Sequence, residues 1–191
     1  MPLSFAVLGL LVEQGDGADE LTQRARDRIV GWEPARASVV EALTALRQQG
    51  LVRVRGVAAG AGGRTRDRYE ATVEGARAFN AWMCDSPRRL LSIEELKVRL
   101  ALTQPYHRIH LHAALQEQWR LCIDQMGRSL HLPWAAEPPT RASRHLGFGH
   151  LLTRVEMIHL HAMMVTIEDC LAELEASPAR SLRDVRGTPR A

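Results

Sequence analysis

Residues 34–75 read PARASVVEALTALRQQGLVRVRGVAAGAGGRTRDRYEATVEG, and this stretch decides the fold. Pro34 precedes a segment with helical periodicity, and Gly50 ends it as a C-terminal glycine does. The face of this helix is formed by Ser38, Val39, Ala42, Leu43 and Leu46. Two alternating runs follow, joined by a glycine- and alanine-rich tip over 58–63, which is typical of a β-hairpin. The order of helix, strand, tip, strand and helix predicts the recognition helix and wing of a winged helix-turn-helix.

The hairpin is rich in arginine. Between Arg47 and Arg68 there are six arginines and one acid, Asp67, so the local net charge is +5. A flexible arm that carries arginines can follow a phosphate backbone or enter a minor groove of DNA. The alternative is a solvated hairpin with ordinary surface arginines. The helix that precedes the hairpin favours DNA binding.

The composition is compatible with one large domain or two small ones, at 191 residues and a net charge of +3. This mildly basic balance permits nucleic-acid binding without diagnosing it. Three widely spaced cysteines form no metal-ligand pair and indicate a reducing setting. The chain opens directly into an apolar segment without a basic leader, and no apolar run approaches the length of a membrane span. We therefore expect a cytoplasmic protein.

The segments before the recognition helix complete a three-helix arrangement. Residues 3–12 are almost wholly apolar and predict a short buried helix. Asp19 is expected to cap a second helix, whose inner face is formed by Leu21, Ala25 and Ile29. Three helices followed by a hairpin give the winged-helix order, so we assign residues 1–86 to a DNA-binding domain.

The order and spacing of several motifs resemble the PadR family of bacterial transcription regulators. The matching segments occur in order within about the first 85 residues; they are LSFAVLGLL, ELTQRARDRI, SVVEALTALRQQGLVRVR and RYEATVEGARAF. The resemblance implies a dimeric DNA-binding protein, most often a repressor, with a helical C-terminal dimerisation region. The DNA contacts expected on this basis come from Arg36, Ser38, Val39, Arg53, Arg55, Arg64, Arg66 and Arg68.

Three positions depart from the family pattern. Asp19 and Val40 stand where the family has tyrosines, and Glu41 places an acid on the recognition helix. Valine donates no hydrogen bond to phosphate, and Glu41 opposes close approach unless it points away or accepts from a cytosine amino group. Residues 1–46 hold four arginines and seven acids, for a net charge of −3. Two explanations stay open: an altered operator, or a ligand- or protein-binding module that has weakened or lost operator recognition.

The second region, residues 90–176, is expected to be a helical dimerisation region. Ser92 is placed to cap a helix with Glu95 at the capping-box position, and Pro105 starts a longer helix. The last helix, over about 146–175, has two apolar faces and therefore two partners. One partner is the 105–131 helix, and the other is a second subunit or, in a monomeric bundle, the same chain. The dimerisation face is predicted at Leu151, Val155, Ile158, Ala162 and Val165.

No catalytic or metal site is expected. The histidines lack a carboxylate or cysteine at a ligand spacing, and no nucleophile and base are placed together. Trp119, Met126 and Met163 are candidates to line an effector pocket for a small apolar or aromatic ligand, although ordinary core packing explains each of them too. Residues 177–191 are polar with proline and glycine, and we expect a disordered tail.

Overall fold

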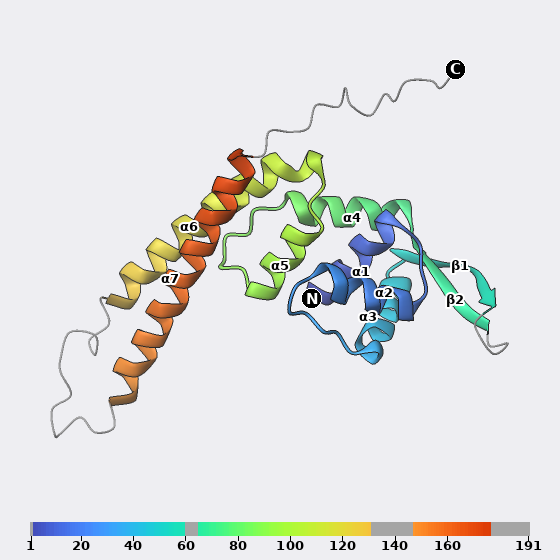
Figure 1. Ribbon diagram of the computed structural model, residues 1–191, viewed down its shortest axis with the longest axis horizontal. Helices are drawn as coiled ribbons and strands as arrows, with labels where there is room; N and C mark the ends of the chain where they lie inside the picture. Colours follow the sequence, from blue (N-terminus) through green and yellow to red (C-terminus); the bar gives the residue numbers. More distant parts are fainter. Residues whose placement is uncertain (1, 60–64, 131–146, 177–191) are drawn as a thin grey trace, which may run out of the picture. The chain divides into compact units, whose positions relative to one another are not determined.

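The computed structural model describes residues 2–59, 65–130 and 147–176 (Figure 1). The chain is mainly helical, with one two-stranded antiparallel sheet in its first half. The predicted fold class, a winged helix-turn-helix followed by a helical region, is confirmed. In chain order the elements are α1 (Pro2–Glu13), α2 (Ala18–Arg28), α3 (Arg36–Gln48), β1 (Val52–Ala59), β2 (Thr65–Ala71), α4 (Val73–Cys84), α5 (Ile93–Ala101), η1 (Pro105–His107), α6 (Arg108–Leu130) and α7 (Gly147–Ala176).

The chain divides into two compact units. The first runs to Asp85 and resumes over Leu91–His107, while the second combines Ser86–Leu90 with the chain from Arg108 onward. This division differs from the expected boundary near residues 86–90, because α5 joins the winged helix. The reason is burial: Val98 on α5 and Leu102 just after it are at most 1% exposed in the core of the first unit.

The first unit is built around α1. Six consecutive residues of this helix, 6–11, are at most 3% exposed, so it is buried on every side, as predicted. Helices α2, α3, α4 and α5 all contact it. Gly9 allows the closest approach, because a Cβ there would lie 2.5 Å from the ring of Phe79 on α4.

Helix α3 buries the face that its periodicity predicts. Val39, Ala42, Leu43 and Leu46 are buried, and Gly50 ends the helix at a φ of +72°. The inner face of α2, predicted at Leu21, Ala25 and Ile29, is likewise at most 1% exposed. The predicted cap of α2 is wrong: Gly17 occupies that position without a side-chain bond.

The wing is an antiparallel hairpin whose register pairs Val52 with Ala71 and Arg53 with Glu70. A β-bulge interrupts the ladder between Val54 and Gly56. The loop between α1 and α2 also joins β2, since the backbone of Asp16 exchanges hydrogen bonds with Tyr69 at 3.0 and 2.9 Å. Strand β2 is therefore held at the base of the wing by β1 on one side and by the loop between α1 and α2 on the other.

The junction between α3, β1 and α4 explains the sequence GLV and the sequence ATVEG. The Thr72 Oγ1 accepts a hydrogen bond from the Gly75 backbone at 3.0 Å and donates one to the Gly50 carbonyl at 2.8 Å. The Thr72 backbone N–H donates to the Leu51 carbonyl at 3.0 Å. A Cβ at Gly75 would lie 2.0 Å from the same Leu51 oxygen, so only glycine fits this crossing without a shift.

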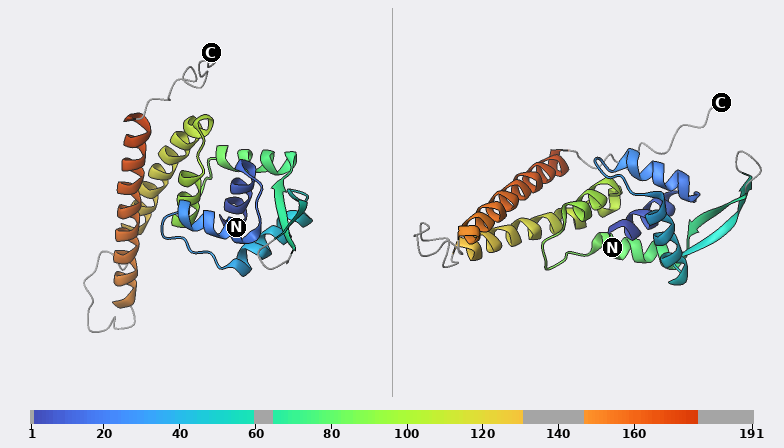
Figure 2. Two further views of the ribbon diagram at one scale, coloured as in Figure 1. Left: turned by 45° about the vertical axis from the view of Figure 1, so that its right-hand side comes forward. Right: turned by 90° about the horizontal axis from the view of Figure 1, so that it is seen from below.

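The second unit is a pair of long helices. Helices α6 and α7 lie side by side along their lengths (Figures 1 and 2). The buried side chains between them come from Leu111, Ala114, Leu115 and Cys122 on α6 and from Leu160, Met163 and Ile167 on α7. The short segment 86–90 is tied to α6 by Gln118, whose amide donates to the carbonyls of Pro87 and Arg89 at 3.1 and 2.9 Å. No helix in the described part of the chain is long and apolar enough to span a bilayer.

Candidate nucleic-acid interface

The outward face of α3 is the complement of its buried face. Ala37, Glu41, Thr44, Arg47 and Gln48 are all exposed on it. Arg47 lies close enough to the wing for its charge to act on Tyr69. Burial and then Asp67 raise the pKa of Tyr69, and the positive charge of Arg47 lowers it by less. Of these five, the sequence predicts an influence on DNA contact for Glu41 and for Arg47, the first of the six arginines in the basic stretch. The 3.6-residue period that assigned the buried face also assigns this outer face.

One of the expected DNA contacts is wrong. Val39 is 0% exposed and packs in the core with Leu43 and Leu46. A side chain in this position stabilises α3 from inside and touches no ligand without unfolding. Ser38, its neighbour, is half-buried and stays a candidate for contact through its hydroxyl.

The start of α3 carries an ion pair. The Arg36 guanidinium contacts the Asp19 carboxylate, which reaches across from the first turn of α2. The Arg36 side chain is 64% exposed, so phosphate has access to it. Asp19 therefore does not cap its own helix; it holds an arginine at the head of the next one. Any phosphate that takes up Arg36 competes with this carboxylate.

Two arginines of β1 share one acid of β2. Glu70 Oε1 lies 2.5 Å from Arg53 Nη2, and its Oε2 lies 3.2 Å from Arg55 Nη1. The arginine side chains are 69% and 73% exposed, whereas that of Glu70 is 16% exposed beneath them. These residues and Val54 line a shallow recess of about 490 Å³ on the wing. Arg53 and Arg55 therefore lie on one side of β1, as alternation along a strand requires.

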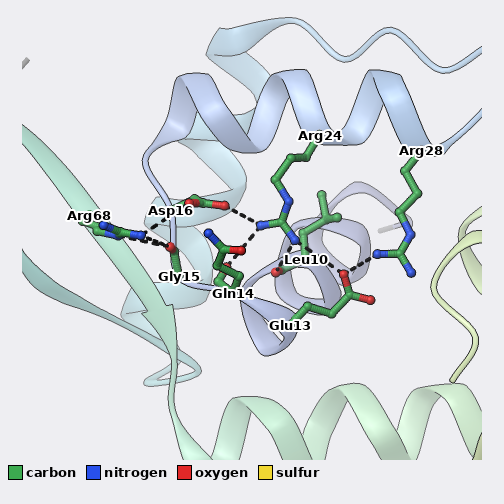
Figure 3. A network of polar contacts seen from close by, with 8 residues as sticks. All are labelled: Leu10, Glu13, Gln14, Gly15, Asp16, Arg24, Arg28 and Arg68. Atoms are coloured by element: carbon green, nitrogen blue, oxygen red, sulfur yellow. Dashed lines mark hydrogen bonds and ion pairs between the residues drawn. The ribbon is translucent and has the colours of Figure 1, made fainter. Parts of the chain in front are cut away.

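Arg68 belongs to a network at the base of the wing (Figure 3). Its guanidinium donates to the Gly15 carbonyl at 3.0 and 3.1 Å and lies 3.7 Å from Asp16 Oδ1. Arg24 on α2 contacts the other Asp16 oxygen and also reaches the Leu10 carbonyl. Arg68 is half exposed, so it fixes the hairpin to the loop between α1 and α2 while its outer side faces solvent.

The remaining predicted arginines lie near the tip. Arg64 is outside the described residues. Arg66 lies in β2 with its backbone opposite Ala58, and its side chain is outside the described part. Their contacts with DNA stay predictions.

Helix α7 presents one buried and one exposed apolar face. Met163 and Ile167 pack towards α6 and are at most 6% exposed. The predicted dimerisation face lies on the opposite side of the helix and faces solvent in the single chain. Its large members are exposed as follows: Leu151 53%, Val155 64%, Ile158 62% and Val165 43%, and Ala162 between them is exposed as well.

The residues predicted for an effector pocket take different roles. Trp119 is half-buried, and its indole N–H donates to Glu168 on α7 at 3.0 Å. Met163 is buried in the packing of the two helices, and Met126 is half-buried. Among the residues that the structure describes, no three His, Cys, Asp or Glu side chains are placed to hold a metal ion.

Comparison with known proteins gives matches among solved structures. The chain is similar to PadR regulators. Bacillus subtilis PadR in complex with operator DNA aligns over 90% of this chain and 97% of its own, at 18% identity and a TM-score of 0.41. The same protein in complex with p-coumaric acid aligns over 92% and 99%, at 16% identity and a TM-score of 0.38. A PadR-like transcriptional regulator from Bacillus cereus aligns over 91% and 98%, at 14% identity and a TM-score of 0.35. No protein-family model and no curated protein matches the chain.

The structure shows what the PadR-like motifs of this chain do in the fold. The leading LGLL segment is the buried α1, with Gly9 against Phe79, and the segment from Tyr69 to Gly75 closes the wing onto α4. The PadR-like motifs of this chain are thus requirements of packing and capping.

Proposed function

We propose that this chain is a PadR-like transcription regulator that binds double-stranded DNA as a homodimer and acts as a ligand-responsive repressor. The observation that carries the proposal is the exposed outer face of α3 beside an arginine-bearing wing. A fold alone implies no function, so the argument rests on the side chains of this surface.

The mechanism follows from the dimensions of DNA. The outer face of α3 enters a major groove, which admits a helix, and Thr44 and Gln48 face the base edges there. Arg36 and the wing arginines contact the phosphate backbone or the neighbouring minor groove. The apolar face of α7 pairs with the same face of a second copy, which makes an isologous dimer. The dimer reads a pseudo-palindromic operator with half-sites one or two turns apart.

The proposed effector site lies with Trp119, Met126 and Met163 in the second unit, where α6 and α7 pair. A flat apolar or aromatic ligand suits aromatic and methionine walls. Binding there would change how the two α7 helices pair, and with it the spacing of the two α3 helices on DNA.

The experiment that tests the proposal is fluorescence anisotropy of the purified protein with the duplex upstream of its own gene. A scrambled duplex of equal length serves as the control, and both are titrated across a salt series. We expect tighter binding to the native duplex that persists at physiological salt. A triple variant with alanine at Arg64, Arg66 and Arg68 should weaken binding to both duplexes and flatten the salt dependence, by about 0.9 in slope for each lost phosphate contact. Equal affinity of this variant and the parent would remove the wing from the interface.

A second candidate function is a PadR-like ligand- or protein-binding module with weakened operator recognition. The observation that favours it is the pairing of arginines with acids on the interface itself: Arg36 with Asp19, and two wing arginines with Glu70. This module would dimerise but bind the native and scrambled duplexes equally weakly. Val40 supplies the discriminating change, since it is half-buried on α3 and can donate no hydrogen bond. Under this candidate, Val40→Tyr should raise affinity for DNA. An unchanged affinity would indicate that the chain reads its operator through other residues.

A further inference from the structure

Glu70 on β2 forms ion pairs with both arginines of β1. It stands directly opposite Arg53 in the register, and both of its carboxylate oxygens are used, one by each arginine of β1. It is the least exposed member of the cluster, at 16%. The arginines lie over it and point their outer surfaces to solvent. A phosphate that approaches the wing at this place meets the two guanidinium groups first.

A bulge in β1 falls at Arg55, one of the two arginines that pair with Glu70. Arg55 is the extra residue between the pairs Val54–Tyr69 and Gly56–Arg68, so it has no partner of its own in the ladder. A bulge bends the strand and re-aims the side chain at the inserted position. Arg55, two residues from Arg53 on the same strand, reaches the carboxylate that also pairs with Arg53. Two cations therefore converge on one acid, and the cluster keeps a net charge of +1.

We propose that Glu70 is a built-in competitor of DNA phosphate for Arg53 and Arg55, and that it lowers the affinity of the wing for any duplex. This inference rests on the proposed DNA-binding function. In the free protein Glu70 holds both guanidinium groups in place, as a phosphate would. On DNA the arginines exchange this carboxylate for backbone phosphate. For each arginine, contact with DNA then replaces the ion pair to Glu70 with an ion pair to phosphate. A tight complex therefore needs the further contacts of α3.

The exchange has a signature in the salt dependence. When the arginines leave it, Glu70 is left with a negative charge close to the DNA backbone, where it attracts a cation from solution. The complex thus takes up about one ion and releases correspondingly fewer in total. A neutral residue of the same shape at position 70 takes up none. Its log–log salt slope should be steeper than that of the parent by about one.

The test compares Glu70→Gln with the parent protein by anisotropy, on a scrambled duplex and on the duplex upstream of its gene. Asp67→Asn is the matched control, because it removes one negative charge from the same strand outside the Arg53–Glu70–Arg55 cluster. We expect Glu70→Gln to bind both duplexes roughly three- to tenfold more tightly, as the release of two exposed ion pairs suggests. Asp67→Asn should change the affinity less than about twofold. The gain from Glu70→Gln should vanish in the Arg53→Gln/Arg55→Gln background, which closes a double-mutant cycle.

The outcomes distinguish the competitor role of Glu70 from the proposed DNA-binding function. If the parent binds DNA and Glu70→Gln binds equally or less tightly, the competitor role is wrong and the DNA-binding function stands. An equal gain in Asp67→Asn, or in the background without the two arginines, attributes the effect to net charge and also overturns the inference. If neither protein binds either duplex at about 50 mM salt, the proposed function fails, and the inference fails with it. Thermal melts of each variant verify that the wing is still folded.

Discussion

Thr72 provides the sharpest test of how the recognition helix, the wing and α4 are joined. The change Thr72→Val keeps the shape of the side chain and removes its hydroxyl. Two hydrogen bonds disappear: the bond from the Gly75 N–H, which caps α4, and the bond to the Gly50 carbonyl at the end of α3. The backbone bond from Thr72 to Leu51 is untouched. The variant therefore isolates the contribution of one hydroxyl to a junction of three elements.

The magnitude follows from these two bonds. Loss of an N-terminal cap costs about 1 kcal/mol, within a range of about 0.5–2. A neutral hydrogen bond to a backbone carbonyl contributes about 1 kcal/mol net. Both bonds involve the Thr72 hydroxyl, which accepts through a lone pair in the first and donates its proton in the second, so they do not compete. We expect Thr72→Val to lower the free energy of unfolding by about 2 kcal/mol.

The assay is urea unfolding followed by circular dichroism, with Thr44→Val as the matched control. Thr44 lies on the exposed face of α3, and its hydroxyl donates to the Val40 carbonyl one turn back at 2.8 Å. A bond of this kind caps nothing and is replaced by water, so the control should stay within about 0.5 kcal/mol of the parent. If Thr72→Val and Thr44→Val have the same stability, the hydroxyl of Thr72 does not hold the junction, and the explanation of the ATVEG motif is wrong.

Two further predictions concern the second unit and the cysteines. Val155→Glu should convert a dimer to a monomer in light scattering, because it places a charge on the exposed apolar face of α7. The control His161→Glu, which is also exposed on α7 but lies outside this face, should stay dimeric. A dimeric Val155→Glu would refute the assigned interface. With a thiol reagent at about pH 8, Cys84 should react rapidly because it is exposed, and Cys122 should react only on unfolding, because burial both shields its thiol and raises its pKa, which lowers the thiolate fraction. Cys170 is half-buried and burial also raises its pKa, so Cys84→Ser should remove the rapid phase. Rapid labelling of Cys122 in that variant, identified by mass spectrometry of its peptide, would contradict the packing of the two long helices.

Much of the fold could be predicted because its strongest signals are local. The apolar run in α1 leaves no polar face, so the helix has to be central. The period of α3 and the glycine at position 50 set that helix, and the alternating runs around the tip set the hairpin. The unit boundary could not be found in this way. The sequence SPRR over 86–89 has the composition of a linker, yet the chain returns to the first unit for α5. What draws α5 back is the burial of Val98 and Leu102, and burial depends on contacts that are distant in sequence.

The site was predicted less well than the fold. The local charge of +5 covers residues 47–68 and leaves out Glu70, the acid two residues further along that pairs with Arg53 and Arg55. Glu70 neutralises part of that charge across the strands, through ion pairs with Arg53 and Arg55 that depend on which residues the register brings together. Val39 is predicted both as a DNA contact and as part of the apolar face of α3, and its burial shows that the apolar period decides between the two. Asp19 is predicted as a cap, and the structure pairs it instead with Arg36, 17 residues away at the start of α3.

The pairing of these arginines bears on why a dimer is required. Four of the residues expected to contact DNA each pair with a carboxylate in the free protein; they are Arg36, Arg53, Arg55 and Arg68, paired with Asp19, Glu70 and Asp16. Exchange of one exposed ion pair for another yields little free energy, so one copy alone should bind a half-site weakly. A second copy joined through α7 makes the second half-site contact intramolecular, which can raise affinity by about two to four orders of magnitude without a new contact. Val155→Glu, which leaves the DNA-facing surface intact, should therefore weaken binding to the native duplex more than Arg53→Gln does. A monomeric Val155→Glu that binds this duplex as tightly as the parent would show that each subunit alone supplies the affinity, and would remove the reason for the dimer proposed here.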